Sequence, residues 1–140
     1  AEFSHLEAES PWVTLEDILK VQEQLVSYVI QETVRQRSED LAFLKRDVSS
    51  LKKVEPPFER LPYNRAIEIL KSKGFMVAEQ DGSRREIRVG DDLNIDSERE
   101  LTKDADRPIF VIGYPIAVKP FYVKEDPDNK GVGLAAETQF

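Results

Sequence analysis

The chain has 140 residues and carries 20 lysines and arginines against 27 aspartates and glutamates, a formal net charge of −7 at pH 7; this length is enough for one domain with a conventional hydrophobic core. The lack of cysteine excludes disulfides, thiol catalysis and cysteine-based zinc sites, the single histidine excludes a histidine-rich metal centre, and the acidic balance argues against nucleic-acid binding through bulk positive charge. No apolar run approaches the roughly 20 residues that span a bilayer, and the first ten residues lack the basic and apolar regions of a signal peptide, so we expect a soluble, cytoplasmic protein.

The N-terminal part is predicted to form a short strand and one long helix. Residues Glu2 to Glu9 alternate, imperfectly, between apolar and acidic side chains, which indicates a strand that stops at Ser10-Pro11. Thr14 and Asp17 have the spacing of a capping box, and apolar residues then recur with helical periodicity. The pattern predicts a helix from about Leu15 to Leu44.

A connection and a shorter helix follow. Residues 45–62 contain a Ser-Ser pair and Pro56-Pro57, which are typical of a loop, with room for one helical turn at Val48 to Leu51. Asn64 is a candidate N-cap for the next helix, which continues through Leu70. Gly74 then stands where a left-handed residue ends a helix.

Residues 75–89 carry a hairpin signal. Asp81-Gly82 lies between two short stretches that contain apolar and β-branched residues, and this dipeptide favours a tight turn between antiparallel strands. A third helix is expected from about Ser97 to Lys103, with either Asp96 or Ser97 as its N-cap.

The C-terminal third is richer in strand formers. Ile109 to Ile112 is predicted as a buried strand and Val118 to Lys124 as a second one, with a turn at Gly113-Tyr114-Pro115 between them. A loop from Asp126 to Gly131 precedes a returning strand, Val132 to Ala136. The order of elements, without strand-helix-strand repetition, predicts the α+β class with an antiparallel sheet.

Generic chemical motifs are weak in this sequence. The loop that begins at Asp126 resembles a calcium loop, with Glu137 at its twelfth position. However, Lys130 occupies a ligand position and the flanks indicate strands, whereas a calcium loop needs helices. We therefore predict no metal site. The sequence also has no glycine-rich phosphate loop and no nucleophile elbow.

Two further features each allow two interpretations. The acidic residues Glu2, Glu7 and Glu9 lie close together and fit either the binding of a cation or ammonium group or exposure to solvent. The pair Phe121-Tyr122, beside Lys119 and Lys124, fits either contact with nucleic acid or strand packing with lysines that extend to solvent.

Three stretches together resemble a known family. They are EFSHLEAE at residues 2–9, GDDL at 90–93 followed by Glu98-Arg99, and the segment from Arg107 to Tyr122 with RPIFV, YP and KPFY. In this order they are similar to the catalytic domain of class II asparaginyl-tRNA synthetases and their relatives, the aspartyl-tRNA synthetases and the archaeal asparagine synthetase paralogue. The resemblance implies an incomplete antiparallel class II sheet with flanking helices, residues 1–140 being part of a catalytic domain.

The resemblance also implies roles for individual residues. Phe3 would stack on the adenine of ATP, and Glu9 would lie beside ATP or a metal ion. Glu7 would accept hydrogen bonds from the side-chain amide of asparagine, and Tyr122 would line the amino-acid pocket above a strand formed by the KPFY stretch. Supporting roles near the site would fall to Asp91, Asp92, Glu98, Arg99, Lys119 and Phe121. No residue of the chain is expected to act as a catalytic nucleophile.

The implied reaction is ATP-dependent activation of asparagine to asparaginyl-adenylate, followed by transfer to tRNA(Asn). Mg²⁺ would bridge the phosphates of ATP. Two alternatives are an asparagine synthetase paralogue, which acts through aspartyl-adenylate, and a non-catalytic interaction module on the same scaffold.

The family's phosphate-binding arginines would lie outside the chain on either side of it. We therefore expect this polypeptide alone to be inactive, and the parent protein to be a homodimer that binds tRNA mainly through other regions. Two stretches depart from the family pattern: residues 75–89 are longer than expected, and Glu137 stands where aspartate is commoner.

Overall fold

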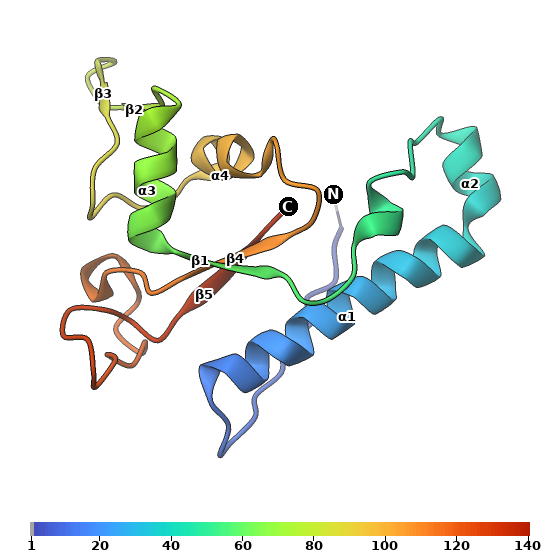
Figure 1. Cartoon of the computed structure of the whole chain (residues 1–140), viewed down its shortest axis with the longest axis horizontal. Helices are drawn as coiled ribbons and strands as arrows, with labels where there is room; N and C mark the ends of the chain where they lie inside the picture. Colours follow the sequence, from blue (N-terminus) through green and yellow to red (C-terminus); the bar gives the residue numbers. More distant parts are fainter. Residues whose placement is uncertain (1) are drawn as a thin grey trace.

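The computed structural model describes residues 2–140, which form a small mixed sheet with helices on both faces (Figure 1). The helices are α1 (Leu15–Gln36), α2 (Ser38–Phe43), α3 (Tyr63–Ser72) and α4 (Ile95–Thr102), with two 3₁₀ turns, η1 (Leu51–Lys53) and η2 (Ile116–Val118). The strands are β1 (Glu59–Pro62), β2 (Met76–Ala78), β3 (Arg84–Glu86), β4 (Ile109–Ile112) and β5 (Ala136–Gln139).

The three-stranded sheet, in the order β1-β4-β5, separates two hydrophobic clusters. Alternate residues of a strand point to opposite faces. Ile109 and Val111 of β4 pack with buried residues of α3 and α4, whereas Phe110 packs with Leu19 of α1. Because β4 is the central strand and is buried on both faces, it is apolar at every position. The predicted strand over 109–112 is confirmed.

The sheet is mixed, which corrects the expectation that it is wholly antiparallel. β4 pairs with β5 in antiparallel fashion but with β1 in parallel, from Glu59 opposite Ile109 to Pro62 opposite Ile112. The sequence analysis placed residues 59–62 in a loop. β1 is an outer strand of the sheet. Outer strands tolerate charged residues and proline, so the composition of β1 does not indicate a strand. The α+β class is confirmed.

The start of α1 is confirmed and its length is corrected. The Thr14 side chain accepts the Asp17 N–H at 3.3 Å, and the Asp17 carboxylate accepts the Thr14 N–H at 2.9 Å, which completes the capping box. The helix ends at Gln36, and α2 begins after Arg37, whose φ of −119° is not helical. No glycine or proline marks this break, so helical periodicity alone extended the prediction to Leu44.

The caps of the two shorter helices differ from those predicted. α3 begins at Tyr63, directly after β1, with Pro62 as its N-cap, so Asn64 lies inside the helix. α4 begins at Ile95, because the Asn94 side chain accepts the N–H groups of the second and third helical residues. Gly74 follows α3 with φ of +69°, as predicted.

The predicted hairpin is confirmed as β2 and β3, which pair from Met76 opposite Glu86 to Ala78 opposite Arg84. Asp81-Gly82 forms its turn, and Gly82 has φ of +83°. The returning strand β3 ends at Glu86, so the apolar residues Ile87 and Val89 follow the strand and do not belong to it.

Three predicted strands are absent from the structure of residues 2–140. Residues 2–9 are extended but pair with no described segment, and a strand needs a hydrogen-bonded neighbour. The stretch 118–124 contains the end of η2 and a turn in which Val123 N–H donates to the Pro120 carbonyl at 3.0 Å. The last strand is Ala136–Gln139, and the expected one over 132–136 makes only isolated bridges, with Pro115 and Glu125.

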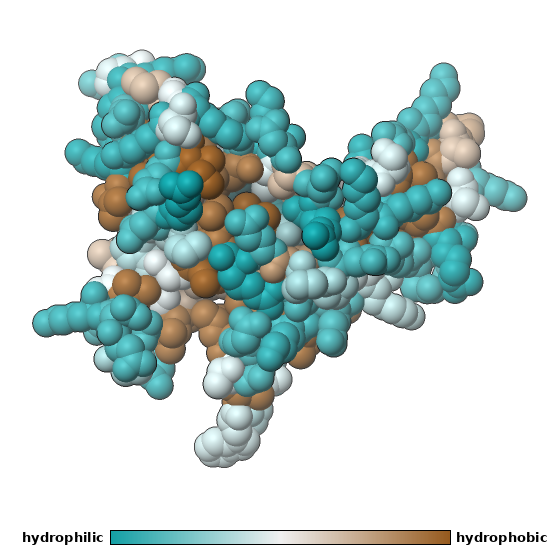
Figure 2. Space-filling view, in the orientation of Figure 1, coloured by the Kyte–Doolittle hydropathy of each residue, from teal (hydrophilic) through white to brown (hydrophobic). Residues whose placement is uncertain are grey.

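On the face shown in Figure 2, hydrophilic side chains predominate, and apolar side chains gather where α3, α4 and the sheet meet. Among the described residues, no helix has the length and apolar character needed to cross a membrane.

Candidate functional site

The end of the parallel strand pair brings two tyrosines together. Pro62 of β1 lies opposite Ile112 of β4, so the chain leaves both strands at the same edge of the sheet. Tyr63 follows β1 and Tyr114 follows β4, both rings are buried, and their centroids are 5.2 Å apart. β5 begins at the same edge, where Glu137 pairs with Val111.

A polar cluster stands on this edge, formed by Asp92, Tyr114, Lys119 and Glu137, which we call the Lys119 cluster. The Lys119 ammonium group lies 2.5 Å from the Glu137 carboxylate and 3.8 Å from that of Asp92. It also sits 3.6 Å from the centre of the Tyr114 ring. The Tyr114 hydroxyl donates to Glu137 at 2.7 Å. Glu137 thus receives two donors from the loop that follows β4.

Exposure differs among the members of the Lys119 cluster. The Lys119 side chain is only 8% exposed, whereas the carboxylates of Glu137 and Asp92 are 40% and 68% exposed. Burial of Tyr114 raises the pKa of its hydroxyl, and the accepting Glu137 carboxylate raises that pKa further, so the tyrosine remains a hydrogen-bond donor. Accessible carboxylates that a buried lysine holds in place can bind the ammonium group of a small molecule, such as an amino acid.

The GDDL loop connects to this edge through two different aspartates. Asp91 is turned inward, and its carboxylate accepts two hydrogen bonds from Arg85 of β3, at 2.6 and 2.7 Å. These bonds lower the pKa of Asp91, against the opposing effect of burial. Asp92 is turned towards Lys119. The structure therefore separates the two aspartates into an anchoring residue and a cluster residue.

The residues expected at the ATP and amino-acid sites in the N-terminal segment lie on the surface. Phe3 is 82% exposed and touches the His5 ring edge-on, with centroids 5.8 Å apart. The Glu7 carboxylate lies 3.7 Å from the His5 imidazole, and Glu9 is also exposed. Their side chains are accessible, but the described residues do not enclose them in a pocket.

The other site residues predicted from the sequence differ in burial. Glu98 of α4 is partly buried, and its charge contributes to the raised pKa of Tyr114. Arg99 is exposed on the same helix. Phe121 is 99% and Tyr122 74% exposed, because the KPFY stretch forms a turn and not the expected strand. The structure thus gathers Asp92 and Lys119, with Glu98 nearby, and leaves the aromatic pair on the surface.

Sequence reasoning missed Tyr63, Tyr114 and Glu137 as site residues. The sequence analysis places Tyr114 in a turn, and no local pattern around Gly113-Tyr114 marks its ring as buried. Glu137 was assigned to the region after a strand. Its pairing with Val111, which places it beside Tyr114, depends on the β4–β5 register.

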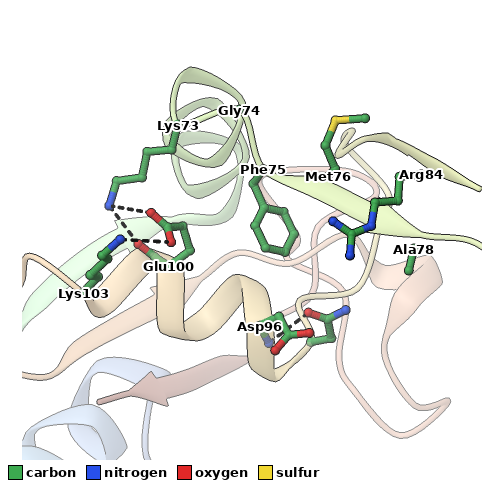
Figure 3. A pocket seen from close by; sticks show the side chains of 10 residues that line it. Lys73, Gly74, Phe75, Met76, Ala78, Arg84, Asp96, Glu100 and Lys103 are labelled. Carbon is green, nitrogen blue, oxygen red and sulfur yellow. Dashed lines mark hydrogen bonds and ion pairs between the residues drawn. The ribbon is translucent and has the colours of Figure 1, made fainter.

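A cavity of about 540 Å³ lies apart from the Lys119 cluster, between the end of α3, the β2–β3 hairpin and α4 (Figure 3). Among the charged groups in its walls, Lys73 lies 3.0 Å from Asp104 and 3.8 Å from Glu100, and Lys103 lies 3.9 Å from Glu100, whereas Arg84 and Asp96 form no ion pair with the described residues. None of the site residues predicted from the sequence lines this cavity. Residues 2–140 also contain no group of three metal-ligating side chains that could hold an ion.

Comparison with known families identifies the family to which this chain belongs. Residues 1–139 match the family described as tRNA synthetases class II (D, K and N). The chain belongs to this family. Its members include the asparaginyl and aspartyl enzymes named in the sequence analysis, so the resemblance inferred from three short motifs is confirmed.

Individual relatives point to the asparagine branch of the family. The chain is 47% identical over 136 residues to the asparagine-tRNA ligase of Pyrococcus furiosus, and this match covers 97% of the chain but 29% of the relative. It also matches the crystal structure of Pyrococcus horikoshii asparaginyl-tRNA synthetase complexed with asparaginyl-adenylate, with a TM-score of 0.80 and 44% identity over 91% of this chain and 27% of that one. The aspartyl-tRNA synthetase of Entamoeba histolytica, at 20% identity and a TM-score of 0.66, shows the fold alone.

Proposed function

We propose that this chain is part of the catalytic domain of an asparagine-tRNA ligase, which activates asparagine with ATP and transfers it to tRNA(Asn). The observation that carries the proposal is the 44% identity and TM-score of 0.80 to a synthetase structure that holds asparaginyl-adenylate. The chain spans less than a third of that protein, so we assign the reaction to the full-length protein that contains residues 1–140. We expect this protein to act in the cytoplasm and to be a homodimer.

The Lys119 cluster supports the proposal by its chemistry. Asparagine carries an ammonium group, and the cluster offers two accessible carboxylates that the buried Lys119 holds in place. We propose that this sheet edge and Tyr122 border the amino-acid pocket. Glu7 would then accept hydrogen bonds from the substrate amide, a role that its exposed carboxylate allows, whereas close approach to an aspartate carboxylate would be repulsive.

Phe3 and Glu9 are proposed to bind ATP, Phe3 by stacking on the adenine. When bound, Mg²⁺ would neutralise charge on the phosphates. Because residues 2–140 hold no cluster of metal ligands, the ion would be held mainly by ATP and by residues outside the chain. The same holds for tRNA, since the chain is acidic.

The proposal is tested by ATP–pyrophosphate exchange with the full-length protein, in separate assays with asparagine and aspartate. Exchange that depends on asparagine is expected, and Glu7→Gln should reduce the preference for asparagine over aspartate by about tenfold or more, because a hydrogen bond to a charged group contributes about 1.5–3 kcal/mol. Glu2→Gln changes another exposed carboxyl of the same segment and serves as the control.

Three results would contradict the proposal in different ways. Exchange with aspartate alone would indicate the paralogue that acts through aspartyl-adenylate. No exchange and no amino-acid binding would indicate a non-catalytic module. Equal effects of Glu7→Gln and Glu2→Gln would remove Glu7 from the amino-acid site and leave the reaction standing.

A further inference from the structure

The GDDL loop is held in place by Arg85, a residue that belongs to none of the sequence motifs. Arg85 is the middle residue of β3, in the stretch 75–89 that is longer than the family pattern predicts. Its guanidinium group donates two parallel hydrogen bonds to the Asp91 carboxylate, at 2.6 and 2.7 Å, and also contacts Glu79. Paired bonds of this type fix both the distance and the orientation of a carboxylate.

Other contacts make the anchored loop rigid. The Arg88 N–H donates to the Asp91 carboxylate at 2.8 Å. The hydroxyl of Tyr63 donates to the Asp91 carbonyl at 2.6 Å and accepts the Gly90 N–H at 2.9 Å. The Asp91 side chain is only 12% exposed. Side chain and backbone of one residue are therefore held from three elements: the hairpin, the loop itself and the start of α3.

The anchored residue directly precedes a member of the Lys119 cluster. Asp92 follows Asp91, and its carboxylate lies 3.8 Å from the Lys119 ammonium group. Tyr63, which holds the loop backbone, packs with a tilted ring against Tyr114, whose face contacts the Lys119 ammonium group. The contacts run without interruption from the hairpin to the cluster, so a displacement of Asp91 would move both a carboxylate and an aromatic support of Lys119.

We propose that Arg85 is a positioning residue that holds Asp91 in place and thereby fixes Asp92 and Lys119 at the sheet edge. The placement of Lys119 is a property of this chain. The consequence for amino-acid binding rests on the proposed function, because it requires that this edge border the substrate pocket. Displacements of about 1 Å at a substrate site cost on the order of 100-fold in rate. Loss of an anchoring residue that does not itself touch the substrate can therefore reduce the rate measurably.

The first experiment measures placement without enzyme activity. The full-length protein is treated with a succinimidyl acetate reagent, and acetylation of Lys119 is followed by mass spectrometry. Arg85→Met should raise the acetylation rate of Lys119 several-fold, because the buried ammonium group loses its fixed surroundings. Arg84→Met is the matched control: Arg84 is the neighbour on the same strand and makes no side-chain hydrogen bond with residues 2–140. Equal rates in both variants would overturn the proposal.

The second experiment measures the consequence in ATP–pyrophosphate exchange. Arg85→Met should raise the KM for asparagine about tenfold, with the KM for ATP unchanged. Arg85→Lys, which retains the positive charge but not the planar pair of donors, should fall between this variant and the wild type. A uniform loss of stability would lower the active fraction, and thus kcat, without changing one KM selectively. An asparagine KM equal to that of Arg84→Met would contradict the inference.

Two further controls separate the possible failures. If Arg85→Met does not fold, Asp91→Asn, which keeps the shape of the side chain, replaces it in both assays with the same expectations. If the wild-type protein shows no exchange with any amino acid, the proposed function is wrong, while the acetylation rates still decide whether Arg85 positions Lys119.

Discussion

Tyr114 shows how one residue connects the core to the candidate site. Its ring is buried between Tyr63 and the sheet, and its hydroxyl reaches Glu137 at the surface. Because burial raises the pKa of the hydroxyl, the tyrosine stays protonated over the physiological range and Glu137 keeps its donor. The same ring carries the Lys119 ammonium group on its face.

Removal of this hydroxyl should be measurable. Tyr114→Phe keeps the ring but removes a donor to a charged acceptor, and we expect a loss of about 1.5–3 kcal/mol in the free energy of unfolding. Urea unfolding of the 140-residue chain, followed by circular dichroism, gives this value. Tyr28→Phe, at an exposed tyrosine of α1, is the control and should change the free energy by less than about 0.5 kcal/mol. Equal losses in both would contradict the assigned role of the hydroxyl.

Lys119 is the corresponding test for the substrate site. Lys119→Met preserves most of the apolar stem and removes the cation. If the Lys119 cluster borders the amino-acid pocket, the KM for asparagine in the full-length protein should rise by about 10- to 100-fold, because the two carboxylates lose the cation that holds them in place. Lys124→Met, at an exposed lysine of the same loop, should behave like the wild type. An unchanged asparagine KM in Lys119→Met would separate this cluster from the substrate.

At the scale of elements, α1 is attached to the sheet through a buried charge. Glu23 lies on the inner face of α1, and its carboxylate accepts the Phe58 N–H at 2.9 Å and a hydrogen bond from Arg60 of β1 at 2.5 Å. Burial opposes ionisation of Glu23, but these hydrogen bonds outweigh it and lower its pKa below the ordinary value of 4.5. The orientation of α1 therefore depends on an ionised glutamate.

This ion pair predicts a pH dependence of stability. Below pH 4.5 the unfolded chain binds a proton on Glu23 before the folded chain does, so stability falls as the pH falls through the lowered folded pKa and is fully present above 4.5. At pH 7, Glu23→Gln should lower the free energy of unfolding by about 1.5–3 kcal/mol, and the difference from the wild type should shrink in acid. Thermal melts between pH 2.5 and 7 measure both effects, with Glu39→Gln, an exposed residue of α2, as control. A difference that is constant with pH would contradict this assignment.

The N-terminal cap of α1 predicts a smaller, local effect. Thr14 and Asp17 satisfy each other's backbone N–H groups at the helix start. Thr14→Ala should cost about 1 kcal/mol, the usual value for the loss of an N-cap side chain. Thr14→Ser retains the hydroxyl oxygen and should restore most of this stability in the same urea titration. A serine variant as unstable as the alanine variant would show that the hydroxyl is not the stabilising group.

At the scale of the whole molecule, the chain contains one complete layered core but an open surface. Both hydrophobic clusters around β4 are buried. The outer face of α1, however, exposes an apolar stripe that contains Val21, Leu25 and Tyr28. The segment before α1 also lies on the surface, with Phe3, Leu6 and Trp12 exposed. Apolar stripes of this kind mark surfaces that other protein segments cover. The chain also spans only 29% of the P. furiosus relative.

We therefore predict that the 140 residues and the full-length protein differ in activity. The isolated chain should show negligible asparagine-dependent ATP–pyrophosphate exchange, because the residues proposed to bind ATP and the amino acid are exposed and not enclosed by the described residues. The full-length protein should show exchange under the same conditions. Measurable exchange by the folded, isolated chain would contradict this prediction and would show that residues 1–140 contain all groups that the reaction needs.

What the sequence determined by itself was local or carried by short motifs. The Thr14 capping box, the Asp81-Gly82 turn and the buried strand 109–112 were predicted because each depends on residues close together in the chain. The family membership was predicted from three short motifs in a fixed order. The tertiary structure alone decided the parallel pairing of β1, the absence of strands at residues 2–9 and 118–124, and the register that places Glu137 beside Tyr114. These features depend on which distant segment supplies a hydrogen-bonding partner, and that choice is made by the packing of the whole sheet and not by any local pattern.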